Sequence, residues 1–147
     1  MNLAEAVRIC KEKNDYSPMI EQVPYAKFLG MGLMRAGDEL TFTLEKRESN
    51  IGNPTLPALH GGVIAGFLEH AAVLHLLFFM EQPKMPKIID ISIDYLSAGH
   101  YRETYAECKV VRLGRKVANV SMKAWQESRE QPIAVARAQF LLDAPLI

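Results

Sequence analysis

The sequence predicts an α+β fold in which one long central helix is wrapped by a curved antiparallel sheet of about six strands. An almost continuously apolar stretch over residues 61–80 is flanked by segments in which apolar and polar residues alternate. The links between the later segments are too short for crossover helices, which favours antiparallel pairing. A helix that is apolar on most sides needs cover on most sides, and a curved sheet supplies that cover.

Two short helices and two strands are expected before the long helix. Residues 3–13 have the spacing of a short amphipathic helix, and residues 19–22 predict a second short helical stretch. A strand is predicted over residues 28–34. Leucine and phenylalanine alternate with threonine over residues 40–44, which is a clear strand signal. Glycine and proline residues over 48–59 predict a loop.

The long helix and four further strands complete the predicted fold. The helix is expected to end near residue 80 because two prolines follow within residues 82–86. Alternating residues then predict the four strands. These strands cover 89–95, 106–110, 118–124 and 134–140, and the links between them cover 99–103, 114–116 and 127–132.

The composition indicates a single domain over residues 1–147, with a short N-terminal helical segment at about 1–24. Hydrophobic residues make up 49% of the 147 positions, which is enough to bury a core without disulfides or metals. The 17 basic residues balance the 17 acidic ones, so neither nucleic acid nor a membrane surface is expected as a partner.

The cysteines and the apolar helix bear on the location of the protein. Cys10 and Cys108 form no metal-ligand pattern and no disulfide framework, so we expect reduced thiols in a cytoplasmic protein without metal or cofactor. The N-terminus lacks the apolar region of a signal peptide. The long helix approaches the length that spans a membrane. Its three ionisable side chains would be costly in lipid, so a helix buried in a soluble core is expected.

The start of the long helix carries the first chemical signal. Gly61 and Gly62 stand at the helix start, where backbone N–H groups have no helical partner. These N–H groups lie at the positive end of the helix dipole. Because neither residue has a side chain, a ligand carbonyl can approach these donors closely. This pattern is typical of an oxyanion site for acyl transfer.

Glu69 carries the second signal, because it interrupts the apolar stretch of the same helix. A carboxylate among apolar neighbours costs free energy unless it has a partner or lines a cavity. Such a group suits the role of a general base. The residues alone equally allow a glutamate at an exposed edge of the helix.

The spacing of these two signals predicts a second subunit. Gly61 and Glu69 are eight residues apart, which is about 12 Å along a helix axis. One thioester carbon therefore cannot lie near both groups of one helix. An antiparallel helix from a second subunit would bring its Glu69 to the first subunit's Gly61, and a two-fold homodimer would contain two equivalent sites.

The segment His60-Gly61-Gly62, followed by a carboxylate at Glu69, resembles the signature of hotdog-fold acyl-CoA thioesterases of the phenylacetate-degradation type. Residues 90–97 resemble the strand that follows the helix in this family, and residues 111–116 resemble its Gly-Arg hairpin. The similarity covers roughly residues 17–142. It implies the hotdog fold, an acyl-CoA or other acyl thioester as substrate, and a homodimer that in many relatives pairs into a tetramer.

The resemblance also implies roles for individual residues. The Gly61 N–H would polarise the thioester carbonyl, with Gly62 beside it in the substrate-binding loop. Glu69 would activate water or attack the carbonyl directly, and His60 would shape the loop. Relatives often carry an asparagine in this loop, for which Asn53 is the candidate. No metal is implied.

Arg115 and Lys116 lie in the predicted link between two strands. The resemblance implies that they hold the phosphates of coenzyme A. As residues alone they fit a solvated turn equally well.

Two other functions stay open. Ile88 stands where many relatives have a serine or threonine that positions water, so the chain is alternatively a non-catalytic module that binds acyl thioesters. If the chain does hydrolyse them, another group such as His70 would hold the water. A hotdog hydratase is a further alternative, although the paired glycines fit thioesterases better.

Overall fold

The computed structural model describes residues 1–142, so residues 143–147 of the predicted domain lie outside the described residues. The chain begins with three short helices and a two-stranded hairpin. These are α1 Leu3–Lys13, α2 Ser17–Glu21, α3 Pro24–Leu29, β1 Met31–Ala36 and β2 Glu39–Leu44. A short connecting region then leads into the long helix. It contains η1 Glu48–Asn50, β3 Ile51–Asn53 and β4 Ala58–Leu59, and is followed by α4 Gly61–Phe79.

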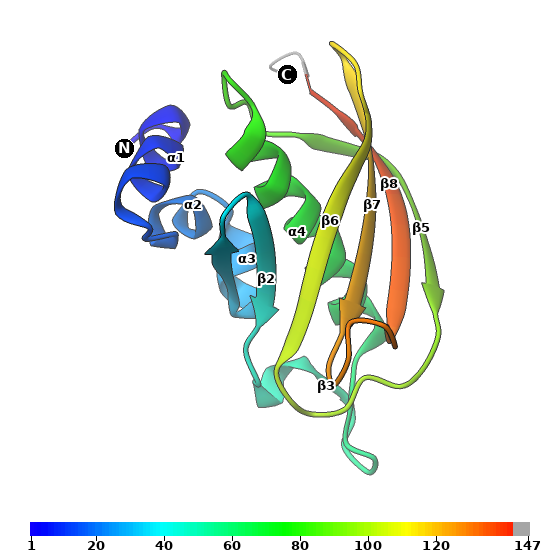
Figure 1. Ribbon diagram of the computed structural model, residues 1–147. Coiled ribbons are helices and arrows are strands. Elements are labelled where there is room, and N and C mark those ends of the chain that lie inside the picture. Colours follow the sequence, from blue (N-terminus) through cyan, green and yellow to red (C-terminus); the bar gives the residue numbers. More distant parts are fainter. Residues whose placement is uncertain (143–147) are drawn as a thin grey trace.

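The last four strands complete one six-stranded antiparallel sheet of order β1-β2-β6-β7-β8-β5. They are β5 Lys87–Tyr95, β6 Thr104–Leu113, β7 Val117–Trp125 and β8 Ala134–Leu141. Figure 1 shows the sheet curving along α4, with α1, α2 and α3 on the side of β1 and β2. This arrangement is the hotdog fold, so the predicted fold class is confirmed.

The core lies between α4 and the concave face of the sheet. The helix buries ten of its 19 residues, and β7 and β8 meet it with small side chains. Five alanines on these two strands are at most 4% exposed, which lets the sheet approach the helix closely. They are Ala118, Ala124, Ala134, Ala136 and Ala138.

Helix α4 is long and apolar enough to cross a membrane by length and composition alone. Of its most apolar stretch, 56% is buried inside the protein. It is therefore the core helix of a soluble globular domain, as the sequence predicts.

The N-terminal helices agree with the prediction in part. Asn2 and Glu5 form a capping box at the start of α1, and Asn14 ends the helix in a left-handed conformation, which confirms the helix over 3–13. The predicted strand over 28–34 is wrong in its first half. Pro24 starts helix α3 there, and Gly30, with φ of +86°, ends that helix before β1 begins.

Two further predictions need correction. The predicted loop over 48–59 contains the hairpin of β3 and β4. In β5 a bulge between Ile88 and Asp90 shifts the alternation. Ile89, the first residue of the predicted strand, is 54% exposed, while Ile88 pairs with Phe140 and packs against the core.

Candidate active site

The first turn of α4 presents one free backbone donor. His60 is the N-cap residue, and its Nδ1 accepts a hydrogen bond from the Gly62 N–H at 2.9 Å. The His60 carbonyl oxygen accepts from the N–H groups of Val63 and Ile64. Within the described part of the chain, the Gly61 N–H has no hydrogen-bond partner, and Gly61 is exposed. The two glycines therefore differ: Gly61 can donate to a ligand, whereas the Gly62 N–H is already engaged.

Tyr95 contacts the residue that carries this donor. Its hydroxyl donates to the Gly61 carbonyl oxygen at 2.7 Å, and a Cβ at Gly61 would lie 3.5 Å from the Tyr95 Oη. The tyrosine closes the end of β5 onto the start of α4 while staying 52% exposed. Sequence reasoning placed Tyr95 only in a strand. Tyr95 lies two residues after Ile93, which packs against the core, and residues two apart in a strand share one face. This spacing was the signal that Tyr95 also faces the helix.

A buried asparagine holds the loop before the helix. The Asn50 side chain is buried and donates from Nδ2 to the Leu29 carbonyl oxygen at 3.0 Å. The Asn50 carbonyl oxygen in turn accepts from the His60 N–H at 3.0 Å. The predicted candidate Asn53 is exposed, and its Oδ1 accepts from the Thr55 N–H at 3.0 Å. The asparagine that links directly to His60 is thus Asn50, and Asn53 shapes a turn.

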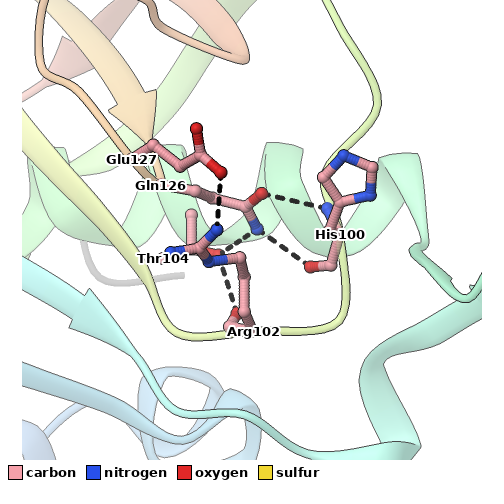
Figure 2. A network of polar contacts seen from close by, with 5 residues as sticks. All are labelled: His100, Arg102, Thr104, Gln126 and Glu127. Carbon is pink, nitrogen blue, oxygen red and sulfur yellow. Dashed lines mark hydrogen bonds and ion pairs between the residues drawn. The ribbon is translucent and has the colours of Figure 1, made fainter.

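A second buried amide supports the helix start from the sheet side. Figure 2 shows Gln126 bridging the backbone of His100 and the side chain of Thr104. The Gln126 Oε1 accepts from the His100 N–H at 3.0 Å, and Nε2 donates to the His100 carbonyl oxygen at 2.9 Å. The neighbouring Gly99 carbonyl oxygen accepts from the Leu59 N–H at 2.8 Å. Gln126 therefore fixes the loop that holds the residues immediately before His60.

Glu69 lies in the middle of α4 and is neither fully buried nor fully exposed. Its side chain is 29% exposed, while Leu68 and Ala72 beside it are completely buried. The nearest charged or titratable group is His70, with Nε2 at 3.7 Å from the Glu69 Oε2. This carboxylate is therefore accessible from solvent on a helix that is apolar over most of its length.

Gly61 and Glu69 are not brought together within one chain. Both belong to the uninterrupted helix α4, so eight residues separate them by about 12 Å along the axis. A single protomer thus offers a carbonyl-binding donor at one place and a carboxylate at another.

Arg115 and Lys116 lie in the turn between β6 and β7, and both are exposed. The Lys116 carbonyl oxygen accepts from the Leu142 N–H at 2.8 Å. Figure 1 shows this turn at the end of the sheet where α4 finishes, away from the start of α4. The two basic side chains are therefore remote from the free donor of their own chain.

The second histidine of α4 belongs to the core. The His75 ring packs 4.7 Å from that of Phe79, and its Nδ1 is buried without a partner in the described residues. Burial lowers the pKa of His75 to about 4. No group of three histidine, cysteine, aspartate or glutamate side chains within residues 1–142 is placed to hold a metal ion.

Comparisons with known proteins point to one family. The family model described as the thioesterase superfamily matches residues 56–133. A protein of Chromobacterium violaceum is 36% identical, with 95% of this chain and 97% of that chain covered and a TM-score of 0.75. No curated protein matches the chain.

More distant structures share the fold. A phenylacetic acid degradation-related protein of Ralstonia eutropha is 17% identical, with 81% of this chain and 89% of that chain covered and a TM-score of 0.71. Thioesterase superfamily member 2 of Mus musculus is 20% identical, with 85% and 92% covered and a TM-score of 0.69.

Proposed function

We propose that this chain, which belongs to the thioesterase superfamily, is a cytoplasmic enzyme that hydrolyses a small or medium acyl-CoA to the free acid and coenzyme A. The observation that carries the proposal is the exposed Gly61 N–H, unpaired within residues 1–142, at the start of a helix that also bears a half-buried carboxylate, Glu69. The two free cysteines support a reducing compartment.

The Gly61 N–H would bind the thioester carbonyl oxygen. In the tetrahedral intermediate this oxygen becomes an anion, and the N–H together with the positive end of the α4 dipole stabilises it. Donors of this kind typically contribute a factor of about 10²–10³ to kcat. The His60 cap and the Tyr95 hydrogen bond support this function because they hold the first turn in place.

Glu69 of a second subunit would take a proton from the attacking water, or attack the carbonyl carbon itself. The 12 Å separation along α4, given by about 1.5 Å per residue, requires this contribution from another chain. The position of β5 supports such a dimer, because among the described strands β5 pairs only with β8 and ends the sheet. Antiparallel pairing of two β5 edges would cover both and place the two α4 helices side by side.

The same symmetry gives Arg115 and Lys116 a role. Their turn lies at the end of the sheet where α4 finishes (Figure 1), so a dimer with antiparallel α4 helices would bring it toward the start of the other subunit's α4. We expect these two side chains to bind the phosphates of coenzyme A across the dimer.

A second candidate function is binding of acyl thioesters without hydrolysis. The bulge in β5 turns Ile88 toward the core, where its apolar side chain offers no hydroxyl to hold water. A binding module would retain the Gly61 donor and bind the ester without releasing a thiol.

The test is thiol release from a panel of acyl-CoA esters by wild type, Glu69→Gln and the matched control Glu12→Gln. Glu12 is an exposed glutamate of α1 paired with Arg8. We expect turnover by wild type and the control, and a loss in kcat of about 10²-fold or more for Glu69→Gln. Equal turnover by all three proteins would refute a role for Glu69 in hydrolysis. Calorimetric binding by a wild type that releases no thiol would favour the binding module.

A further inference from the structure

His70 follows Glu69 on α4, and its ring has one fixed orientation. The His70 Nδ1 lies 2.7 Å from the Gly66 carbonyl oxygen. Because a carbonyl oxygen only accepts hydrogen bonds, Nδ1 must carry the hydrogen. In the neutral ring Nε2 then carries no hydrogen, and its lone pair can accept a hydrogen bond or a proton.

That free nitrogen faces the proposed base. Nε2 lies 3.7 Å from the Glu69 Oε2, with the side chains 15% and 29% exposed. A neutral Nε2 and an ionised carboxylate are both acceptors, so they cannot bond to each other directly. The contact becomes favourable when a water molecule donates to both atoms, or when a proton on one of the two atoms is donated to the other. The pair is thus arranged to share a proton.

A neighbouring aromatic ring limits how far the imidazole can turn. The Tyr25 ring centroid is 5.0 Å from that of His70, and Tyr25 also packs on Phe28 at 5.9 Å. A Cβ at Gly66 would lie 3.0 Å from the Tyr25 Cε2, so this glycine gives the tyrosine its place on the helix. Among residues 1–142, the titratable groups that contact the His70 ring are therefore Glu69 on α4 and Tyr25 on α3.

We infer that His70 is a positioning residue that orients Glu69 and receives the proton which Glu69 takes from water. This inference rests on the proposed function. The water oxygen bonds to the thioester carbon, and its proton passes to Glu69. The proton then moves from Glu69 to the His70 Nε2, which leaves an imidazolium beside a restored carboxylate. When the carbon–sulfur bond breaks, the sulfur leaves with the electron pair and receives this proton back through Glu69.

This arrangement gives the site a polar partner that β5 does not provide. Ile88 has no hydroxyl, whereas the His70 Nε2 and the Glu69 Oε2 offer two acceptors 3.7 Å apart. One water molecule can donate to both acceptors, which orients its oxygen for attack.

A double-mutant cycle in kcat tests the inference. His70→Gln retains an amide that can donate to the Gly66 carbonyl oxygen, but it has no basic nitrogen. We expect His70→Gln alone to lower kcat by about 10- to 100-fold with KM changed less than about twofold. In the Glu69→Gln background the same change should cost less than about twofold, because His70 acts through Glu69.

Independent, multiplying losses in the two backgrounds would overturn the inference, as would a His70→Gln enzyme with the wild-type kcat. The matched control is His100→Gln, which makes the same side-chain change at an exposed histidine in the loop after β5. It should leave kcat unchanged.

Nitrogen-15 NMR of the imidazole tests the proton sharing without turnover. The resonances of His70 are assigned by their absence in His70→Gln. We expect hydrogen on Nδ1 and a shift of the Nε2 resonance in Glu69→Gln. An Nε2 resonance that is unaffected by Glu69→Gln would overturn the inference even if thiol is released. Absence of thiol release with the expected NMR result would overturn the proposed function and support the pairing.

Discussion

Gly61 is the residue on which the proposed chemistry depends most directly, because it offers a single backbone hydrogen. Its exposed N–H is unpaired within residues 1–142, whereas the N–H of Gly62 is bound by His60. A Cβ at this position would only make ordinary contact with the Tyr95 side chain, at 3.5 Å from its Oη. The chemistry therefore depends on the hydrogen rather than on any side chain at residue 61.

Gly61→Pro removes that hydrogen while leaving the helix intact. Proline is favoured at the first helical position, and His60 already has the extended conformation, with φ of −65° and ψ of 134°, that a residue before proline adopts. We expect Gly61→Pro to fold normally and to lose a factor of about 10²–10³ in kcat. The control is Gly61→Ala, which keeps the N–H and places its Cβ at an ordinary contact distance of 3.5 Å from the Tyr95 Oη. Steady-state kinetics and thermal unfolding check both, and an active proline variant would remove Gly61 from the mechanism.

His75 should make stability depend on pH. Its folded-state pKa, near 4, lies below the ordinary value of about 6.5, so between these values the unfolded chain binds a proton that the folded chain does not. Stability should therefore fall as the pH decreases from about 7 to 4, by about 3 kcal/mol, and level off below that range. Urea unfolding of wild type and His75→Leu at several pH values measures this. The variant should lack this component, and an identical pH dependence of both proteins would contradict the assignment.

At the scale of elements, the hydrogen bonds around Gln126 show how the sheet supports the helix start. The side chain is 7% exposed and makes three hydrogen bonds to His100 and Thr104. The bond from the Leu59 N–H to the Gly99 carbonyl oxygen extends this support to the residue before His60. The loop after β5 is thus part of the structure that holds the free donor.

Gln126→Leu should be destabilising because it removes the acceptor of the His100 N–H and the donor to the buried Thr104 hydroxyl. We expect the free energy of unfolding to fall by about 1–3 kcal/mol. Gln131→Leu is the matched control on an exposed position and should change it by less than about 0.5 kcal/mol. Urea titrations measure both variants. Equal stability of Gln126→Leu and wild type would show that the buried amide does not support the loop.

The elements also show what the sequence could predict. The apolar run of α4 and the alternation in β7 and β8 are periodic over many residues, so these elements and the antiparallel sheet were predictable. The bulge in β5 was not predictable, because an apolar residue at a bulge has no distinguishing signal in the sequence. In the fold the bulge leaves Ile89 exposed. Helix α3 was missed because Pro24 and Gly30, which start and end it, also occur in loops.

The same limit applies to the site. Glycine spacing and a lone carboxylate mark Gly61 and Glu69 as candidates from the chain alone. The hydrogen bonds that hold the start of α4 and its preceding loop come from Asn50, Tyr95 and Gln126, which are distant in sequence. Their polar side chains have no periodicity that distinguishes them from surface residues. Their roles therefore become visible only when the folded backbone brings them together.

At the scale of the whole molecule, the proposed hydrolysis requires two chains. A protomer holds the donor and the carboxylate on one rigid helix, and it leaves the edge of β5 open. An antiparallel dimer would resolve both features, because each α4 would present its Glu69 to the Gly61 of the other chain. The central claim is therefore that each site is shared between two subunits.

Complementation of two inactive variants tests this claim most directly. Glu69→Gln keeps the donor, and Gly61→Pro keeps the carboxylate, so a mixed dimer would contain one site with both intact groups. Co-expression that forms random dimers should restore about a quarter of the wild-type activity, since half of the dimers are mixed and each has one complete site. If the mixture stays as inactive as the separate variants although mixed dimers are isolated by tag purification, the shared site is contradicted.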